Sequence, residues 1–229
     1  MKTIGMIGGT GWLSTLEYYR LINQGTNKRL GGLNSAKIIL TSFNYAEIDL
    51  LNKKEDHAGV YKLVLDSAQK LKKASADFIV ICANTLHQYA DELEKVIGLK
   101  IVHIADATAK EVRKKGLSKI GLLGTKFTME MDFYTRRLSE SGIESLVPPK
   151  FEREFIHNAI MNELLKEEFK AETKDKFLNI INDLEQQGAQ GIVLGCTEIP
   201  LLIKQEDTKL PVFNTLEIHA KAAVDFALS

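Results

Sequence analysis

The chain has 229 residues, of which 45% are hydrophobic and 26% are charged, a composition typical of a globular protein. Thirty basic residues balance thirty acidic ones, so the charge favours neither nucleic acid nor a membrane surface as a partner. No apolar run approaches the ~18 residues that a membrane-spanning helix requires. The two cysteines and the lack of a signal-peptide pattern predict free thiols in the cytoplasm.

Strands and helices alternate through the first half of the chain. We expect strands at residues 3–7, 36–43, 77–82 and 100–104. We expect helices at residues 14–27, 54–74, from about 86 onward and 105–115, the first with Ser14 or Thr15 as its N-cap. This alternation predicts a mainly parallel sheet covered by helices, which is the α/β class.

The pattern begins again at residues 119–125, which resemble residues 3–9. Further strands are expected at 192–194 and 210–213, and helices at 129–140, 152–165, 172–187 and 215–228. The repeat predicts two pseudo-symmetric three-layer α/β domains. We expect the first to comprise residues 1–112, joined by the C-terminal helix at 215–229, and the second to comprise residues 113–214. An active-site cleft is expected between them.

The most informative segment is Gly195-Cys196-Thr197-Glu198, which follows the buried strand at 192–194. In open α/β sheets, ligands bind at the carboxyl ends of the strands. A helix is predicted to begin near Ile199, so its dipole should make the Cys196 thiol ionise more easily. The alternative is that Cys196 is a small core residue, but the polar residues that follow it favour a functional thiol.

The repeat places the segment Ala83-Asn84-Thr85 over Cys196-Thr197-Glu198. Cys82 then lies over Gly195, one residue early. A shift of one residue turns a strand side chain to the opposite face, so we expect Cys82 to be a core residue.

A glycine-rich turn follows the first strand at Gly9-Thr10. It lacks the dinucleotide fingerprint G-x-G-x-x-G, so we interpret it as a turn that holds a substrate carboxylate. Asn84, Thr85 and Thr197 offer further hydrogen-bond donors for the charge that develops on this carboxylate.

Four motifs carry a resemblance to a known family along nearly the whole chain. They are Ile7-Gly8-Gly9-Thr10, Ala83-Asn84-Thr85, Asn162-Glu163-Leu164 and Gly195-Cys196-Thr197-Glu198-Ile199-Pro200-Leu201. With them the chain resembles the aspartate/glutamate racemases, amino-acid racemases that use two thiols. The resemblance implies a site without cofactor or metal, an amino acid or related carboxylate as ligand, and a homodimer. It also implies that Cys196 is the acid–base thiol.

The resemblance implies a set of substrate-binding residues as well. They are Gly9, Thr10, Ala83, Asn84, Thr85, Lys166, Thr197 and Glu198. Lys166 matches a lysine that the family uses for the side-chain carboxylate, and the alternative is a solvated helix charge. Members that act on aspartate carry a basic residue after the second strand, where this chain has Glu47. Glu198 either orients the Cys196 thiol or is an ordinary acid in a first helical turn.

Ala83 departs from the family pattern, because the first family thiol stands at this position. Alanine cannot transfer a proton, so racemisation by two groups needs Thr85, a bound water or Cys82 as a substitute. Two other functions therefore stay open. One is a single-thiol enzyme of the arylmalonate decarboxylase type, which protonates one face of an enolate after loss of carbon dioxide. The other is a non-catalytic member that binds an amino acid.

Overall fold

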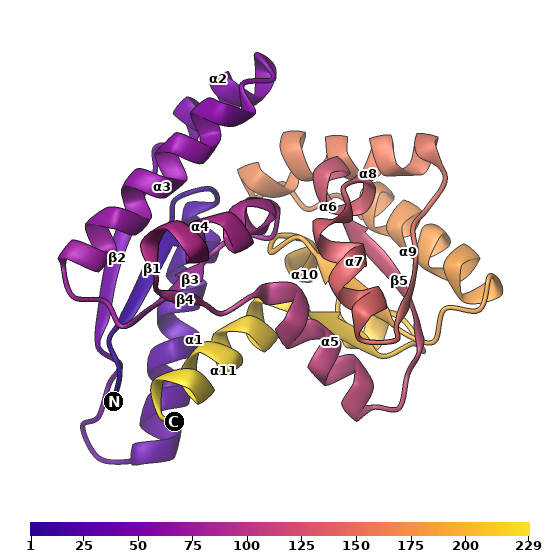
Figure 1. Ribbon diagram of the computed structural model, residues 1–229. Coiled ribbons are helices and arrows are strands. Elements are labelled where there is room, and N and C mark those ends of the chain that lie inside the picture. Colours follow the sequence, from indigo (N-terminus) through magenta and orange to yellow (C-terminus); the bar gives the residue numbers. More distant parts are fainter. The chain divides into compact units, whose positions relative to one another are not determined.

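The computed structural model describes all 229 residues, and the chain divides into two compact units. The first unit is Met1–His103 with His219–Ser229, and the second is Ile104–Ile218. Each unit holds one four-stranded sheet in which every pair of neighbouring strands is parallel. The predicted α/β class with two parallel sheets is confirmed (Figure 1).

The sheet of the first unit has the strand order β2-β1-β3-β4. Its strands are β1 (Ile4–Gly8), β2 (Ile38–Ser42), β3 (Phe78–Ile81) and β4 (Lys100–Ile101). The helices of this unit are α1 (Trp12–Leu30), α2 (Tyr45–Lys53), α3 (His57–Lys73), the 3-10 helix η1 (Thr85–Tyr89), α4 (Ala90–Ile97) and most of α11 (Thr215–Ala227). β1 and β3 are buried along their whole length, as central parallel strands usually are.

Helices cover both faces of this sheet. On one face, Val64 and Leu71 of the amphipathic helix α3 pack in one core with Ile79 of β3. On the other face, the ring of Phe226 in α11 lies edge-on to Phe78, with the ring centroids 4.8 Å apart. Figure 1 shows α11 in yellow running beside α1. The last helix of the chain thus contributes to the core of the first unit.

The helix predicted for residues 54–74 begins later than expected, and a separate helix precedes it. α3 begins at His57 because the Asp56 carboxylate accepts the Gly59 N–H at 2.8 Å. Glu55, with a positive φ of 55°, interrupts the helix between α2 and α3. The sequence pattern does not reveal α2, because Ile48 is its one buried residue.

The sheet of the second unit has the order β6-β5-β7-β8. Its strands are β5 (Lys119–Gly124), β6 (Glu144–Leu146), β7 (Ile192–Gly195) and β8 (Val212–Asn214). Its helices are α5 (Ile104–Lys114), α6 (Lys126–Glu130), α7 (Asp132–Glu140), α8 (Lys150–Asn162), η2 (Leu164–Lys166), α9 (Ala171–Gln186), α10 (Ile199–Leu202) and η3 (Gln205–Asp207). None of the helices in the structure has both the length and the apolar character needed to cross a membrane.

Two elements of the second unit differ from the sequence-based expectation. The single helix predicted for residues 129–140 is two helices, because Met131 is extended, with φ −87° and ψ 151°. β6 was not expected, because this edge strand has three residues and none of them is fully buried. Short edge strands carry little apolar periodicity, so the sequence gives a weak signal for them.

The two sheets have the same strand connectivity, and this connectivity determines the edge at which each sheet is expected to bind a ligand. In each sheet the chain leaves the first central strand toward one side and returns to build the other side. The strand order therefore reverses between β1 and β3, and again between β5 and β7. Ligands of open α/β sheets bind at such switch points, at the carboxyl ends of the strands.

A cluster of buried histidines lies in the first unit, next to the two points where the chain passes between the units. The Nε2 of His219 donates to the carbonyl of Val102 at 2.7 Å, and its Nδ1 accepts from the Tyr18 hydroxyl at 2.8 Å. The ring of His87 lies edge-on to His103 and His219, at centroid distances of 4.7 and 5.2 Å. These contacts connect α1, η1 and α11.

We expect acid to destabilise the fold through this cluster. Burial lowers the pKa of His219 to about 3, and the nearby His87 contributes to this shift, whereas a histidine in an unfolded chain titrates near ~6.5. Between these values the unfolded chain binds more protons, so stability is full above pH ~6.5 and falls as the pH drops toward 3. For His219 alone, the loss at pH 5 is about 2 kcal/mol.

Urea unfolding at pH 7 and at pH 5 measures this effect. In His219→Gln, the difference in unfolding free energy between the two pH values should shrink by about 2 kcal/mol relative to wild type. His57→Gln, at an exposed histidine, is the control and should leave the difference unchanged. An unchanged difference in His219→Gln would contradict the assignment.

Candidate functional site

Cys196 stands at the carboxyl end of β7, directly before α10, and 6% of its surface is exposed. β7 pairs with β5, and Gly195 is in register with Gly124. Thr125, which follows β5, therefore lies at the same edge of the sheet as Cys196. The two glycines allow this close approach, because a Cβ on Gly124 would lie 2.9 Å from the Gly195 carbonyl oxygen.

The thiol of Cys196 is hydrogen-bonded to a buried carboxylate. Its Sγ donates to Oε2 of Glu198 at 3.0 Å, and the Thr197 hydroxyl donates to the same oxygen at 2.9 Å. Glu198 is itself buried. Of the two roles considered for Glu198, the structure thus supports orientation of the thiol.

The expectation that Cys196 ionises easily is wrong. Burial raises the pKa of the thiol well above its usual value, and the charge of Glu198 and its hydrogen bond raise it further. The backbone N–H groups of Glu198 and Ile199 act in the opposite direction, but more weakly. α10 is a single turn of four residues, so no long helix dipole offsets the burial. The resting site therefore holds a protonated thiol.

The glycine-rich turn of the first unit is held by hydrogen bonds to the hydroxyl of Thr15. Gly9, with φ 90°, donates its N–H to the Thr15 hydroxyl at 2.9 Å, and this hydroxyl donates to the Gly11 carbonyl at 3.1 Å. Gly8 must be a glycine, because a Cβ there would lie 2.4 Å from the Thr15 methyl. We expected this turn to hold a carboxylate, but the Gly9 N–H already donates to the Thr15 hydroxyl. Thr10 is half-buried and makes no hydrogen bond of this kind.

Thr15 lies within the first turn of α1 and is not its N-cap residue. The N-cap position belongs to Gly11, which provides no side-chain cap, so the expected capping by Ser14 or Thr15 is wrong. The sequence reasoning missed the bond from Thr15 to the turn, because it joins residues that are six positions apart and depends on the path of the turn.

The segment Ala83–Thr85 lies after β3, the strand next to β1, at the same edge of the sheet as the glycine-rich turn. Asn84 is buried, and Ala83 and Thr85 are half-buried. His87 donates from Nδ1 to the Ala83 carbonyl at 2.7 Å and so holds this turn in place. Ala83 offers no group that can transfer a proton.

Cys82 is a core residue, as expected. It is 1% exposed, and its backbone N–H donates to the Ile7 carbonyl at 2.8 Å. Burial raises the pKa of its thiol far above the usual range. Both cysteines are free, and neither is ionised at neutral pH.

Lys166 ends the 3-10 helix η2 and has an exposed side chain. η2 packs against α10, because Leu164 shares one core with Ile199 and Cys196. The neighbouring carboxylate of Glu163 bonds to Lys170 at 3.3 Å. The structure therefore brings the backbone of Lys166 close to the Cys196 segment and pairs Glu163 with a different lysine.

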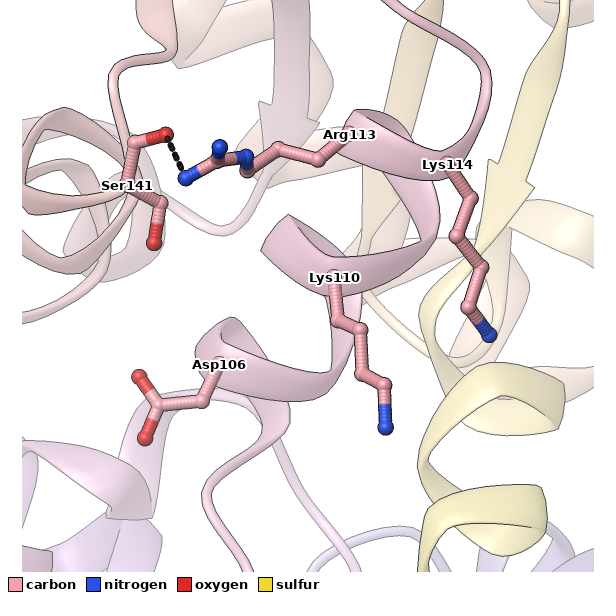
Figure 2. Close-up of a pocket in the computed structure, with 5 residues that line it drawn as sticks. All are labelled: Asp106, Lys110, Arg113, Lys114 and Ser141. Carbon is pink, nitrogen blue, oxygen red and sulfur yellow. Dashed lines mark hydrogen bonds between the residues drawn. The ribbon is translucent and has the colours of Figure 1, made fainter.

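No group of three or more His, Cys, Asp or Glu side chains is arranged to hold a metal ion. A cavity of about 520 Å³ does occur in the second unit, on the exposed face of α5 (Figure 2). Its lining residues are Asp106, Lys110, Arg113, Lys114 and Ser141. None of them belongs to the predicted site, and Arg113 and Lys114 already bond to Ser141 and Glu111. The cavity is therefore a feature of the surface, with no built site for chemistry.

Comparisons with known proteins agree with the resemblance seen in the sequence. A sequence model of the Asp/Glu/hydantoin racemase family matches residues 7–223. The structure of a candidate Asp/Glu racemase from Yersinia pestis is 47% identical, with a TM-score of 0.94 and 100% coverage of both chains. The structure of an aspartate racemase homologue from Pyrococcus horikoshii OT3 is 36% identical, with a TM-score of 0.86 and the same coverage of 100%.

A curated relative is the broad-specificity amino-acid racemase RacX of Bacillus subtilis. It is 24% identical over 174 residues, which cover 76% of this chain and 75% of RacX. The structure of an arylmalonate decarboxylase is more distant, at 15% identity and a TM-score of 0.54 over 99% of this chain and 93% of that one. This last likeness extends to the fold alone.

We expect Glu198→Gln to lower the pKa of the Cys196 thiol, because the variant removes the negative charge that disfavours the thiolate. Alkylation of Cys196 by iodoacetamide, followed by mass spectrometry across a pH series, measures the change. The midpoint should move to lower pH in Glu198→Gln. It should stay in place in Glu206→Gln, which removes an exposed carboxylate of the same unit. A midpoint that stays or rises in Glu198→Gln would refute the electrostatic coupling.

Proposed function

Because the chain belongs to the Asp/Glu/hydantoin racemase family, we propose that it is a cofactor-independent amino-acid racemase in which Cys196 transfers the α-proton. The single observation that carries this proposal is the hydrogen bond between the Cys196 thiol and the buried Glu198 carboxylate. A thiol that is paired with a carboxylate has both a proton to give and a base that can take it.

The reaction begins with the transfer of the thiol proton to Glu198. The thiolate that forms is stabilised by the backbone N–H groups of Glu198 and Ile199, which already favour the ionised sulfur. The thiolate then takes the α-proton of the amino acid: an S–H bond forms, the Cα–H bond breaks, and the electron pair moves into the substrate carboxylate. Hydrogen-bond donors around the bound substrate stabilise the charge that develops on this carboxylate.

Return of a proton to Cα completes the reaction. Return from Cys196 to the same face restores the original enantiomer with exchange of the α-hydrogen, whereas return to the opposite face inverts it. The opposite face needs a second donor. Of the substitutes that the sequence offers, which are Thr85, a bound water molecule and Cys82, the last is the weakest, because Cys82 is buried and strongly disfavoured as a thiolate.

The proposed substrate is an amino acid, and we expect the site to prefer amino acids with an acidic side chain. The exposed cation of Lys166 stands beside the segment that contains Cys196, as η2 packs against α10, and can pair with a side-chain carboxylate. RacX is named for broad specificity, so neutral amino acids belong among the compounds to be tested. We further propose a homodimer, and a cytoplasmic location that suits two free thiols.

A second candidate function is favoured by one observation, the alanine at position 83. A single-thiol enzyme of the arylmalonate decarboxylase type protonates an enolate from one side and needs no second acid–base group. Cys196 as a protonated resting thiol suits this chemistry too. A member that only binds an amino acid is the third candidate, and it would show saturable binding without exchange.

Incubation with single enantiomers of aspartate, glutamate and neutral amino acids in heavy water separates these functions. We expect α-deuterium by NMR and inversion by chiral chromatography in the wild type. Cys196→Ala should lower α-exchange by roughly 10²-fold or more. The matched control Cys82→Ala removes the other thiol and should retain exchange. Full exchange in Cys196→Ala would remove Cys196 from the mechanism, and exchange without inversion would favour the one-sided reaction.

A further inference from the structure

His87 is a buried polar side chain to which the proposed reaction assigns no role. It lies in η1, two residues after Thr85, and 2% of its surface is exposed. The polar atoms of a buried side chain normally have hydrogen-bond partners, and a buried atom without one calls for an explanation. The two ring nitrogens of His87 differ in this respect, and the difference indicates what the ring does.

The first nitrogen, Nδ1, is bonded to the candidate binding segment. It lies 2.7 Å from the carbonyl oxygen of Ala83. A carbonyl oxygen only accepts hydrogen bonds, so Nδ1 carries the ring proton. The backbone N–H of His87 also donates, to the carbonyl of Asn84 at 3.1 Å. One residue thus holds two consecutive carbonyl groups of the segment, the first with its side chain and the second with its main chain.

The second nitrogen, Nε2, is buried and has no hydrogen-bond partner in the protein. Because the proton is on Nδ1, Nε2 carries a lone pair, and a buried acceptor without a donor costs free energy. An apolar side chain of similar size would avoid this cost. Packing alone therefore does not explain a histidine at position 87, whereas the bond from Nδ1 to the Ala83 carbonyl does.

The surroundings of His87 keep its ring neutral and in one orientation. The rings of His103 and His219 lie edge-on to it, at centroid distances of 4.7 and 5.2 Å. His219 is itself fixed at both nitrogens, by the Tyr18 hydroxyl and the Val102 carbonyl. Burial lowers the pKa of His87 well below its usual value, and the neighbouring His103 lowers it further. The ring is therefore an uncharged hydrogen-bond donor at neutral pH.

These features suit His87 to positioning and not to proton transfer. Nδ1 is engaged by Ala83, and Nε2 is buried, so neither nitrogen offers a free surface to a ligand. The ring does fix the backbone that carries Asn84 and Thr85, two of the residues that we expect to bind the substrate. A displacement of about 1 Å in groups that orient a substrate costs on the order of 10²-fold in rate.

We propose that His87 is a positioning residue for the substrate: the hydrogen bond from its Nδ1 to the Ala83 carbonyl holds Asn84 and Thr85 in the geometry that binds the substrate. This inference rests on the proposed function, because it requires an amino acid as the ligand. It adds a requirement of its own, which is that the side chain at position 87 must donate from the place of Nδ1.

Two amide side chains test this requirement, because they place a donor at different distances from the backbone. The amide nitrogen of His87→Asn takes the place of Nδ1, and that of His87→Gln takes the place of Nε2. We expect the KM for α-deuterium exchange to stay within about threefold of wild type in His87→Asn and to rise by roughly tenfold or more in His87→Gln. His57→Gln, at an exposed histidine of the same unit, is the control and should leave KM unchanged.

The value of KM separates positioning from a role in folding alone. A variant that only folds less well contains less active protein, which lowers the apparent kcat at unchanged KM. A KM in His87→Gln equal to that of wild type would overturn the proposal. A KM that rises as much in His87→Asn as in His87→Gln would also overturn it, because the donor at the place of Nδ1 would then be without effect.

Nitrogen-15 NMR of the histidine rings at pH 7 tests the geometry without activity. We expect a neutral His87 ring with its proton on Nδ1, and a proton on Nε2 or a charged ring would contradict the proposal. If the wild type binds an amino acid without exchange, the dissociation constant from calorimetry replaces KM in the same comparison. A wild type that neither exchanges nor binds amino acids marks a failure of the proposed function itself, and the positioning role falls with it.

Discussion

The hydrogen bond between the Cys196 thiol and the Glu198 carboxylate is the interaction on which the functional account depends. Both groups are buried, and burial makes a negative charge on sulfur costly. Glu198 adds its own negative charge beside the thiol, so the proton stays on sulfur in the resting site. In the proposed reaction the thiol supplies a proton and the carboxylate accepts it, and hydrogen exchange at carbon requires both steps.

In both units a threonine side chain packs against glycines at the ends of the central strands, and in the second unit this packing lies next to the Cys196–Glu198 pair. In the first unit Thr15 packs over Gly8 at the end of β1, and in the second unit Thr128 packs over Gly124 and Gly195 at the ends of β5 and β7. In each case a β-branched side chain occupies the space that a Cβ on glycine would fill. The strand ends and the turns after them are therefore fixed tightly at the edge where the sheet order reverses, which is where ligands bind in such sheets.

Much of this architecture could be predicted from the sequence, because buried parallel strands such as β1, β3, β5 and β7 are continuous apolar runs. The repeat also placed the two candidate segments at the ends of equivalent strands, after β3 and after β7. Elements with little buried surface escaped prediction. α2 buries one residue and β6 buries none, so neither leaves a periodic pattern that could identify it.

The electrostatic state of Cys196 was beyond sequence reasoning for a different reason. The position before a helix start suggested an easily ionised thiol, but the shift depends on burial and on where the Glu198 side chain turns. A carboxylate two residues along the chain could point to solvent or to the sulfur, and the sequence is the same in both cases. The role of Thr15 was hidden in the same way, because its hydroxyl turns back toward Gly9.

The most direct test of the central claim is the rate of α-proton exchange in Glu198→Gln compared with wild type. If Glu198 only raised the pKa of the thiol, its removal would create more thiolate and speed the exchange at neutral pH. If Glu198 takes the thiol proton, the account predicts a rate lower by roughly 10²-fold or more at pH 7, despite the more acidic thiol. An unchanged or faster exchange in this variant would contradict the account.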